Sequence, residues 1–544
     1  MVASTTSHSS SALDRFSRRS KPSVVINLNN QHPPMNNSYS TLDTIKGEVI
    51  VMSDSDIRFE DIFITFEGTS KTVIERPGIA GPSVDRYSAF HTFLRLIQPI
   101  DESQYPQPRN IEVGRTYTFP FTFVVPERLL PNSCCHRHNH QQVHAAHTLL
   151  PPSLGDPALG ENGSKLLDDM GPGVAQIQYA VRAQLSKASS VDDSPKVFVD
   201  AKQNVLIIPA TDEAPPLNIL DDNEEYCMRK EKDVKKGALR GKIGRIVMAA
   251  AQPKALRIPA SATADAAGSE ECVPTTMATV HLRFDPVNEH QQPPRLGKLW
   301  GKLKVNTFFG TEPWNDIPSK TAALAWALNQ RVYTQTISLA TRCVASATWQ
   351  KHASTKPCSS AAPSLHRRDS IQSTSSVESL LGPTASYTGD TYYATSILVP
   401  INLPKTRAYA PTFHSCLTSR TYTLEMSLSY HTPNANLIAP TLAIRVPIQV
   451  STTKSLADAC AVRRRQSRVR NTEDEYFTPR RVTPPQAHCI ERSRSLVTEV
   501  RRGRSDPFFS AVPSASGLAP PEYSNGSSAF AKEKPNQTVV GTTC

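Results

Sequence analysis

Cysteine and histidine gather in one stretch, CCHRHNHQQVHAAH at 134–147. Thiolate and imidazole groups bind zinc, and imidazole also titrates near neutral pH. His140 and His144 have the spacing of paired zinc ligands, but no Cys-x₂₋₄-Cys pair accompanies them and no single helix or strand would collect every histidine. We therefore expect a solvated loop with no metal and no other cofactor. A weak metal or pH-sensitive site at His140 and His144 is the alternative.

Several serines and threonines have the setting of phosphorylation sites. Three serines follow arginines closely, and two threonines precede proline. A phosphate carries a charge of about −1.5 to −2, and beside arginines it would suit a 14-3-3-type partner. An unmodified basic tail is the alternative. The candidates are Ser370, Ser467, Ser495, Thr478 and Thr483.

A short proline motif, LAPPEYS at 518–524, lies near the end of the chain. Paired prolines favour the polyproline II conformation, which binds the aromatic grooves of WW domains at low entropic cost. We expect Pro520 and Pro521 to lie in such a groove and Tyr523 to fill the adjoining apolar pocket. Chance alone would give about 0.1 such motifs in a chain of this composition, so the motif by itself is suggestive.

Other chemistry has little support in the sequence. There is no G-x-S-x-G, H-E-x-x-H, P-loop or G-x-G-x-x-G motif, so we expect no enzyme. The net charge of +11 is concentrated after residue 450, but few aromatic residues accompany the arginines there, so no nucleic-acid partner is expected. The amino-terminal residues lack the apolar region of a secretory signal, and no apolar run is long enough to span a membrane. The ten cysteines are scattered, which indicates free thiols in a reducing compartment.

Alternation of apolar and polar residues is the main structural pattern, and it is typical of half-buried strands. In YTFPFTFVVP (117–126) the aromatic residues fall on one face, and Pro120 suggests an edge strand or a bulge because proline cannot donate to a ladder. No helical period of comparable strength is present. Similar alternation occurs in 61–68, 175–185, 277–284, 422–430 and 442–450.

These strands predict an all-β protein with two immunoglobulin-like sandwiches in tandem. The expected boundaries are a disordered amino terminus (1–21), one sandwich (22–212), a hinge (213–229), a second sandwich (230–451) and a disordered basic tail (452–544). A His- and Pro-rich loop (134–173) and a Ser-rich insert (353–386) interrupt the sandwiches, because both are too polar to repay the cost of ordering.

The order of several segments resembles the arrestin domains of the fungal arrestin-like trafficking adaptors. TYTFPFTFVVPERLLPNSC (116–134), IKGEVIV (45–51) and QIQYAVRAQL (176–185) resemble the arrestin N-domain. GKIGRIVMAAAQPKALRI (241–258) and PTFHSCLTSRTYTLEMSLSY (411–430) resemble the C-domain. The resemblance covers about residues 22 to 451.

The resemblance implies two arrestin-type sandwiches and a non-enzymatic adaptor. Members commonly use Pro-Pro-x-Tyr to recruit WW-domain HECT ubiquitin ligases to membrane transporters or receptors, whose cytoplasmic tails would be the other partners. The expected result is ubiquitination and endocytosis, with the adaptor cytoplasmic and recruited to the plasma membrane and endosomes. A signalling scaffold for a membrane receptor, such as one that senses ambient pH, and a nuclear regulator that uses the basic tail are the alternatives.

Overall fold

The computed structural model describes most of the chain between residues 21 and 453. The residues described all lie in the first of two compact units, which spans Met1–Arg502. They are 21–29, 38–77, 84–160, 167–187, 196–219, 223–236, 241–259, 274–321, 324, 326–353, 387, 389–432, 439–453 and 501–502.

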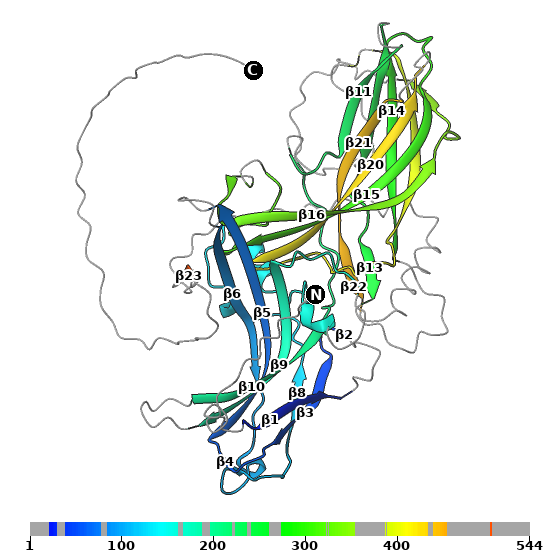
Figure 1. Ribbon diagram of the computed structural model, residues 1–544. Helices are drawn as coiled ribbons and strands as arrows, with labels where there is room; N and C mark the ends of the chain where they lie inside the picture. The colour runs from blue at the N-terminus through cyan, green and yellow to red at the C-terminus, as the bar shows by residue number, and fades with distance from the viewer. Residues whose placement is uncertain are drawn as a thin grey trace, which may run out of the picture. The chain divides into compact units, whose positions relative to one another are not determined.

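Two sheets build the N-terminal sandwich (Figure 1). Neighbouring strands run antiparallel except for the short parallel pair β2–β10. One sheet has the order β1(Ser23–Leu28)-β3(Thr44–Met52)-β8(Tyr117–Val124). The other has the order β2(Ser38–Tyr39)-β10(Lys196–Ile207)-β9(Ala175–Lys187)-β5(Asp61–Pro77)-β6(Val84–Ile97)-β23(Arg501–Arg502), and β4(Ile57–Arg58) pairs with β7(Asn110–Ile111) beside them.

The alternating residues predicted from the sequence form the core of this sandwich. Phe119, Phe121 and Phe123 of β8 are buried, and Phe123 lies 5.8 Å between ring centroids from Phe66 of the facing sheet. Phe66 stacks in turn on Tyr179 of β9 at 6.0 Å. β8 is an edge strand, as Pro120 predicted.

Two further sheets build the C-terminal sandwich. One has the order β11(Arg229–Lys235)-β12(Lys242–Ala250)-β14(Thr275–Pro286)-β18(Thr391–Asn402)-β17(Gln350–Ala353). The other has the order β16(Gln330–Cys343)-β15(Arg295–Gly310)-β20(Thr418–His431)-β19(Phe413–His414), with β21(Thr441–Ile448) also paired to β20. A two-stranded parallel sheet, β13(Leu256–Pro259) with β22(Val450–Thr453), completes this part.

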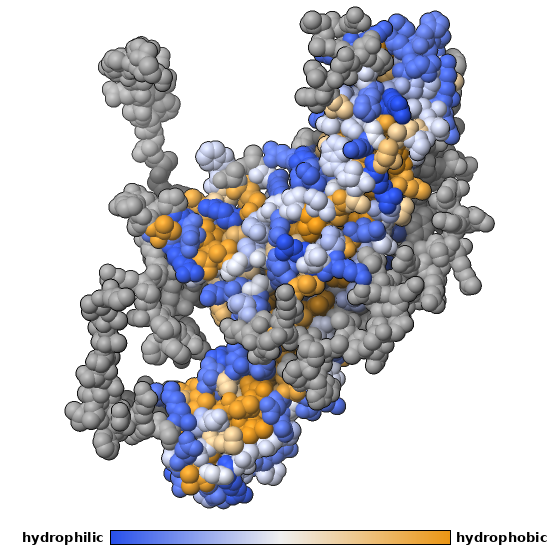
Figure 2. All heavy atoms as spheres, turned by 45° about the vertical axis from the view of Figure 1, so that its right-hand side comes forward, coloured by the Kyte–Doolittle hydropathy of each residue, from blue (hydrophilic) through white to orange (hydrophobic). Residues whose placement is uncertain are grey.

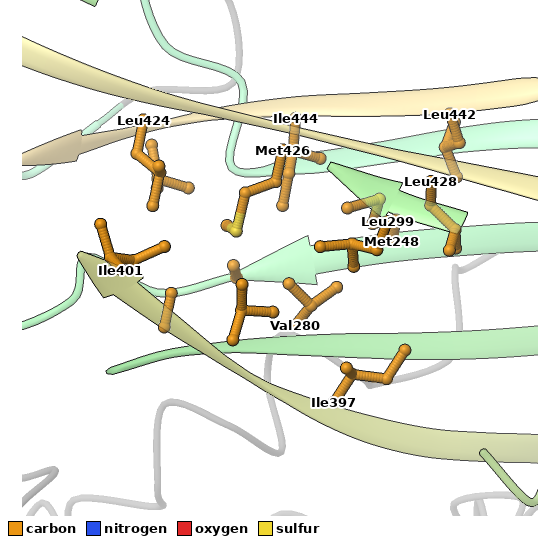
Figure 3. Packing of buried hydrophobic residues seen from close by; sticks show 14 of the residues in the cluster. Met248, Val280, Leu299, Ile397, Ile401, Leu424, Met426, Leu428, Leu442 and Ile444 are labelled. Atoms are coloured by element: carbon orange, nitrogen blue, oxygen red, sulfur yellow. The ribbon is translucent and has the colours of Figure 1, made fainter. Parts of the chain in front are cut away.

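A second apolar core lies between these two sheets. Figure 3 shows Met248, Val280 and Ile397 from the first sheet pointing toward Met426 and Ile444 from the second. All five side chains are buried, and burying such a side chain contributes roughly 1.5–3 kcal/mol. The two sheets therefore form a sandwich, and the predicted all-β class is confirmed.

The predicted hinge is attached to the C-terminal sandwich. Thr211 pairs with Thr452 of β22, and Cys227 pairs with Arg445 of β21. Between these bridges, Gln449 accepts a hydrogen bond from the Ala214 amide at 2.8 Å and donates one to the Ala214 carbonyl at 2.9 Å. The described part of 213–229 is thus hydrogen-bonded to the C-terminal sandwich.

Residues 134–147 are not the solvated loop predicted for them, and the longer loop 134–173 is not too polar to order. This range contains the helix α1(Gln141–His147) and the short 3₁₀ helix η4(Pro157–Gly160), and several of its side chains are buried. The Asp169 carboxylate accepts hydrogen bonds from the Gly155 amide at 2.6 Å and from the Gly171 amide at 2.8 Å. The neighbouring Met170 is buried against the C-terminal core. Tertiary contacts supply the burial that its composition did not predict.

Other predicted boundaries lie close to the ends of strands. β1 begins at Ser23, β17 ends at Ala353 and β22 ends at Thr453. Within the predicted tail, Arg501–Arg502 pair with β6. Residues 1–20, 354–386, 454–500 and 503–544 lie outside the described residues, so the predicted disorder there stays a prediction.

The surface of the described part carries several apolar patches separated by polar residues (Figure 2). On β6, Val84, Phe90 and Ile97 are each more than 60% exposed. No helix among the described residues has the length and apolar character needed to cross a membrane.

Candidate metal centre

The cysteine- and histidine-rich segment is a loop whose two ends are held together. Arg128 and Leu149 form an antiparallel bridge, and the Leu129 amide donates to the Thr148 carbonyl at 2.8 Å. Within the loop, the 3₁₀ helix η3(Pro131–Ser133) precedes Cys134, and α1 ends at His147. Closing the loop therefore brings two residues that are 13 positions apart close to each other.

The helix α1 orients His147 toward the protein interior. Val143 and His147 are one turn apart and both are buried, at 2% and 1% exposure. His140 is the N-cap residue of α1 and lies outside the helical turn, so it does not share this face. The helix thus presents one histidine to Cys134.

Three histidine side chains converge around Cys134. Its Sγ atom lies 3.0 Å from His138 Nε2, 3.3 Å from His136 Nε2 and 3.6 Å from His147 Nδ1. His147 Nδ1 and His136 Nε2 are 3.3 Å apart. All four atoms lie within 4.8 Å of one another. One small ion could contact all of them.

A second cysteine stabilises the charged form of the first. The Cys416 thiol donates to Cys134 Sγ at 3.5 Å, and this bond, followed by those from His136 and His147, lowers the pKa of Cys134 to about 2 against the opposing effect of burial. The same contact and burial raise the pKa of Cys416. Cys134 is thus the hydrogen-bond acceptor of the pair, and the thiolate is the form of cysteine that binds metals.

The surrounding imidazoles have different pKa shifts. Burial lowers the pKa of His138 and of His91, and it lowers that of the half-buried His414 to about 4. At His136 burial also acts downward, but the hydrogen bond and charge of Cys134 raise the pKa overall. Neutral imidazole is the form of histidine that ligates metals, and of the candidate ligands His138 is shifted toward that form and His136 away from it.

The four converging atoms have the chemistry of a transition-metal site. One sulfur and three nitrogens are available, and the group contains no carboxylate. Such soft and borderline donors favour zinc over magnesium or calcium, which take oxygen ligands. A buried thiolate is also costly unless a positive charge compensates it, and Cys134 is only 3% exposed.

The two histidines proposed from sequence spacing are not in this group. His140 has a side chain 74% exposed and lies 3.9 Å from Asp316. His144 contacts the ring of His138 at 5.2 Å between centroids, but it contributes no atom to the cluster. The sequence signal nearest to the cluster is the spacing Cys134-x-His136-x-His138, which supplies three of the four ligands.

No family model matches this chain. No curated protein matches it either. The remaining residues predicted from the sequence lie outside the described residues, so their geometry stays untested: Pro520, Pro521, Tyr523, Ser370, Ser467, Ser495, Thr478 and Thr483. The predicted free thiols are confirmed for the described cysteines, Cys134, Cys135, Cys227, Cys343 and Cys416.

Proposed function

We propose that the chain is an arrestin-type adaptor that links a membrane transporter or receptor to a WW-domain HECT ubiquitin ligase. Tandem all-β sandwiches with separate apolar cores support the adaptor architecture. The single observation that carries ligase recruitment is the segment LAPPEYS, which follows the last strand of the second sandwich in the sequence. Ubiquitination of the bound cargo would then direct its endocytosis.

The sandwiches offer an edge to which a cargo tail could add a strand. β16 is a 14-residue strand at one end of its sheet, and within the described residues it pairs with β15 alone. All of its side chains are exposed or half-buried. Main-chain hydrogen bonds to such an edge give affinity, while side-chain pockets give specificity. The cargo segment would thus be an extended cytoplasmic tail.

Capture by purified WW domains tests ligase recruitment. The full chain and its Tyr523→Ala variant would be compared, with Tyr476→Ala as the matched control because that tyrosine has no proline pair before it. We expect Tyr523→Ala to lose capture and Tyr476→Ala to keep it, since one motif binds with affinity on the order of micromolar and depends on its tyrosine. Equal recovery of all three proteins would refute the proposal.

Transporter turnover separates cargo removal from signalling. If the chain is an adaptor for cargo removal, surface transporters should persist in cells that carry Tyr523→Ala after the stimulus that normally removes them. Unchanged turnover, together with lost WW capture, would favour the receptor scaffold instead.

A further inference from the structure

The spacing of the Cys134 sulfur and the three histidine nitrogens around it is close to that of a tetrahedral metal site. Zinc bonds of about 2.3 Å to sulfur and about 2.0–2.1 Å to nitrogen place neighbouring ligand atoms about 3.4–3.6 Å apart. The nitrogens of His136 and His147 are 3.3 Å apart, and the sulfur lies 3.0–3.6 Å from the three nitrogens. Four of the six ligand–ligand distances are therefore within about 0.6 Å of the tetrahedral values, and the two between His138 and the other histidines are below 4.8 Å.

The types of the ligand atoms determine which metals the site can bind. A thiolate with three imidazoles excludes magnesium and calcium, and a compact tetrahedral arrangement is the preferred geometry of Zn²⁺. We propose that Cys134, His136, His138 and His147 bind one Zn²⁺ ion. Because the protein supplies all four ligands, the site has no open position for substrate and is structural.

The location of the site indicates what the ion would stabilise. Cys416, which follows β19, donates its thiol hydrogen to Cys134 from the C-terminal sandwich. Nearby, the Asn139 amide donates to the Asn315 carbonyl at 2.9 Å, and the Asn139 side chain donates to Asp316. Zinc would fix the 128–149 loop in the conformation that makes these contacts with the C-terminal sandwich.

Cys416 plays a different role from the four ligands. Hydrogen bonds to the ligands of a metal orient them and tune their basicity, and substituting such partners weakens metal affinity by about 10–100-fold. Its thiol lies 3.5 Å from the sulfur of Cys134, but Cys416 does not belong to the group of four converging atoms. We therefore expect Cys416→Ala to weaken zinc binding, whereas loss of a ligand abolishes it. This inference is independent of the adaptor proposal, because it concerns residues far in sequence from LAPPEYS.

Metal content of the purified full chain tests the proposal. Inductively coupled plasma mass spectrometry should find one zinc ion per chain, retained on dialysis against buffer without chelator. Cys134→Ser and His138→Ala should lose it. The matched controls are Cys135→Ser and His140→Ala, which change neighbouring residues of the same type outside the group of four. Equal zinc in ligand and control variants, showing adventitious binding only, would overturn the proposal.

A second measurement avoids reliance on variants that fail to fold. The wild-type chain would be stripped with a chelator under reducing conditions and loaded with Co²⁺. We expect the intense visible bands of tetrahedral cobalt and a thiolate-to-cobalt charge-transfer band, both removed by an equivalent of Zn²⁺. Weak octahedral bands, no uptake by the reduced chain, or purification with a Cys134–Cys416 disulfide in place of metal would refute the assignment.

Discussion

Removing the carboxylate of Asp285 should destabilise the C-terminal sandwich strongly. Arg283 of β14 is fully buried, and its Nε atom lies 2.5 Å from Asp285 Oδ1, which belongs to a side chain only 4% exposed. The guanidinium also lies over the ring of Tyr392 at 4.0 Å. In Asp285→Ala the buried cation would keep its desolvation penalty but lose this anion, which costs about 3–5 kcal/mol.

Replacing both partners should restore most of the lost stability. Apolar side chains of similar size need no compensating charge, so buried ion pairs replaced in this way are often neutral or better by about 1–4 kcal/mol. Arg283→Met/Asp285→Leu should therefore be more stable than Asp285→Ala alone. The expected coupling between the two sites is about 3 kcal/mol, well above the non-additivity of independent sites.

Chemical denaturation followed by tryptophan fluorescence is the appropriate assay. All four tryptophans, Trp300, Trp314, Trp326 and Trp349, lie in the second half of the chain, so their signal follows the C-terminal sandwich. The matched control is Asp233→Ala on the same sheet, because Asp233 pairs with Lys242 at 2.8 Å in an exposed position. Such surface pairs contribute about 0–1 kcal/mol.

The pH dependence of the single variant Arg283→Met gives an independent check. Burial raises the pKa of Asp285, and Arg283 opposes that rise, so removing Arg283 should raise this pKa further. A carboxyl with a raised pKa takes up a proton more readily in the folded state, so stability falls as pH rises from the unfolded toward the folded pKa. Relative to the wild-type chain, Arg283→Met should lose more stability at pH 7 than at pH 5. A cost below about 1 kcal/mol for Asp285→Ala, or additive effects in the double variant, would refute this reasoning.

Three other measurements check separate parts of the structure. Chelating zinc should increase hydrogen exchange of residues 128–149 by mass spectrometry, and unchanged exchange would contradict a structural metal. Gly47→Ala should cost at least about 1–3 kcal/mol in denaturation, since a Cβ would lie 2.5 Å from Phe121 Cζ and closer still to the Asn27 carbonyl. Burial lowers the pKa of His281, so the unfolded chain binds more protons and stability should fall as pH drops below about 6.5. His281→Gln should flatten that decline, and an unchanged slope would exclude this histidine as its source.

The fold class could be predicted because strand periodicity is a local property. Ile177, Tyr179 and Val181 of β9 are buried at alternate positions, and the sequence alone showed them on one face. The prediction worked least well where both faces of a strand are covered. Thr423 of β20 is buried and accepts a hydrogen bond from Asn306 at 3.1 Å, and Asn306 also donates to Glu225. Alternation predicts such a residue on the solvent side, since it carries no information on what a distant segment covers.

The candidate metal site could not be predicted for a related reason. Its ligands follow an irregular path from Cys134 to His138 and then come from α1, so no helical or strand period groups them. The spacing that does fit a regular helix, His140 with His144, belongs to residues that the fold leaves outside the cluster. The bridge between Arg128 and Leu149, which closes the loop, is a tertiary feature of the folded chain.

The contacts between the two sandwiches explain why a metal at this position would matter. Each sandwich has its own large apolar core, and the apolar cluster that contains both Ile74 of β5 and Phe309 of β15 is small. Met170 also packs in the C-terminal core, and Phe413 packs in the N-terminal core. Polar contacts between the sandwiches include the Thr72 hydroxyl to the Gly310 carbonyl at 2.6 Å and Arg420 to the Asp169 carbonyl at 2.9 Å. Each net hydrogen bond contributes only about 0.5–1.5 kcal/mol. An ion that orders the 128–149 loop would therefore support its contacts with Cys416 and Asn315, and its loss would weaken the contact between the sandwiches without unfolding either core.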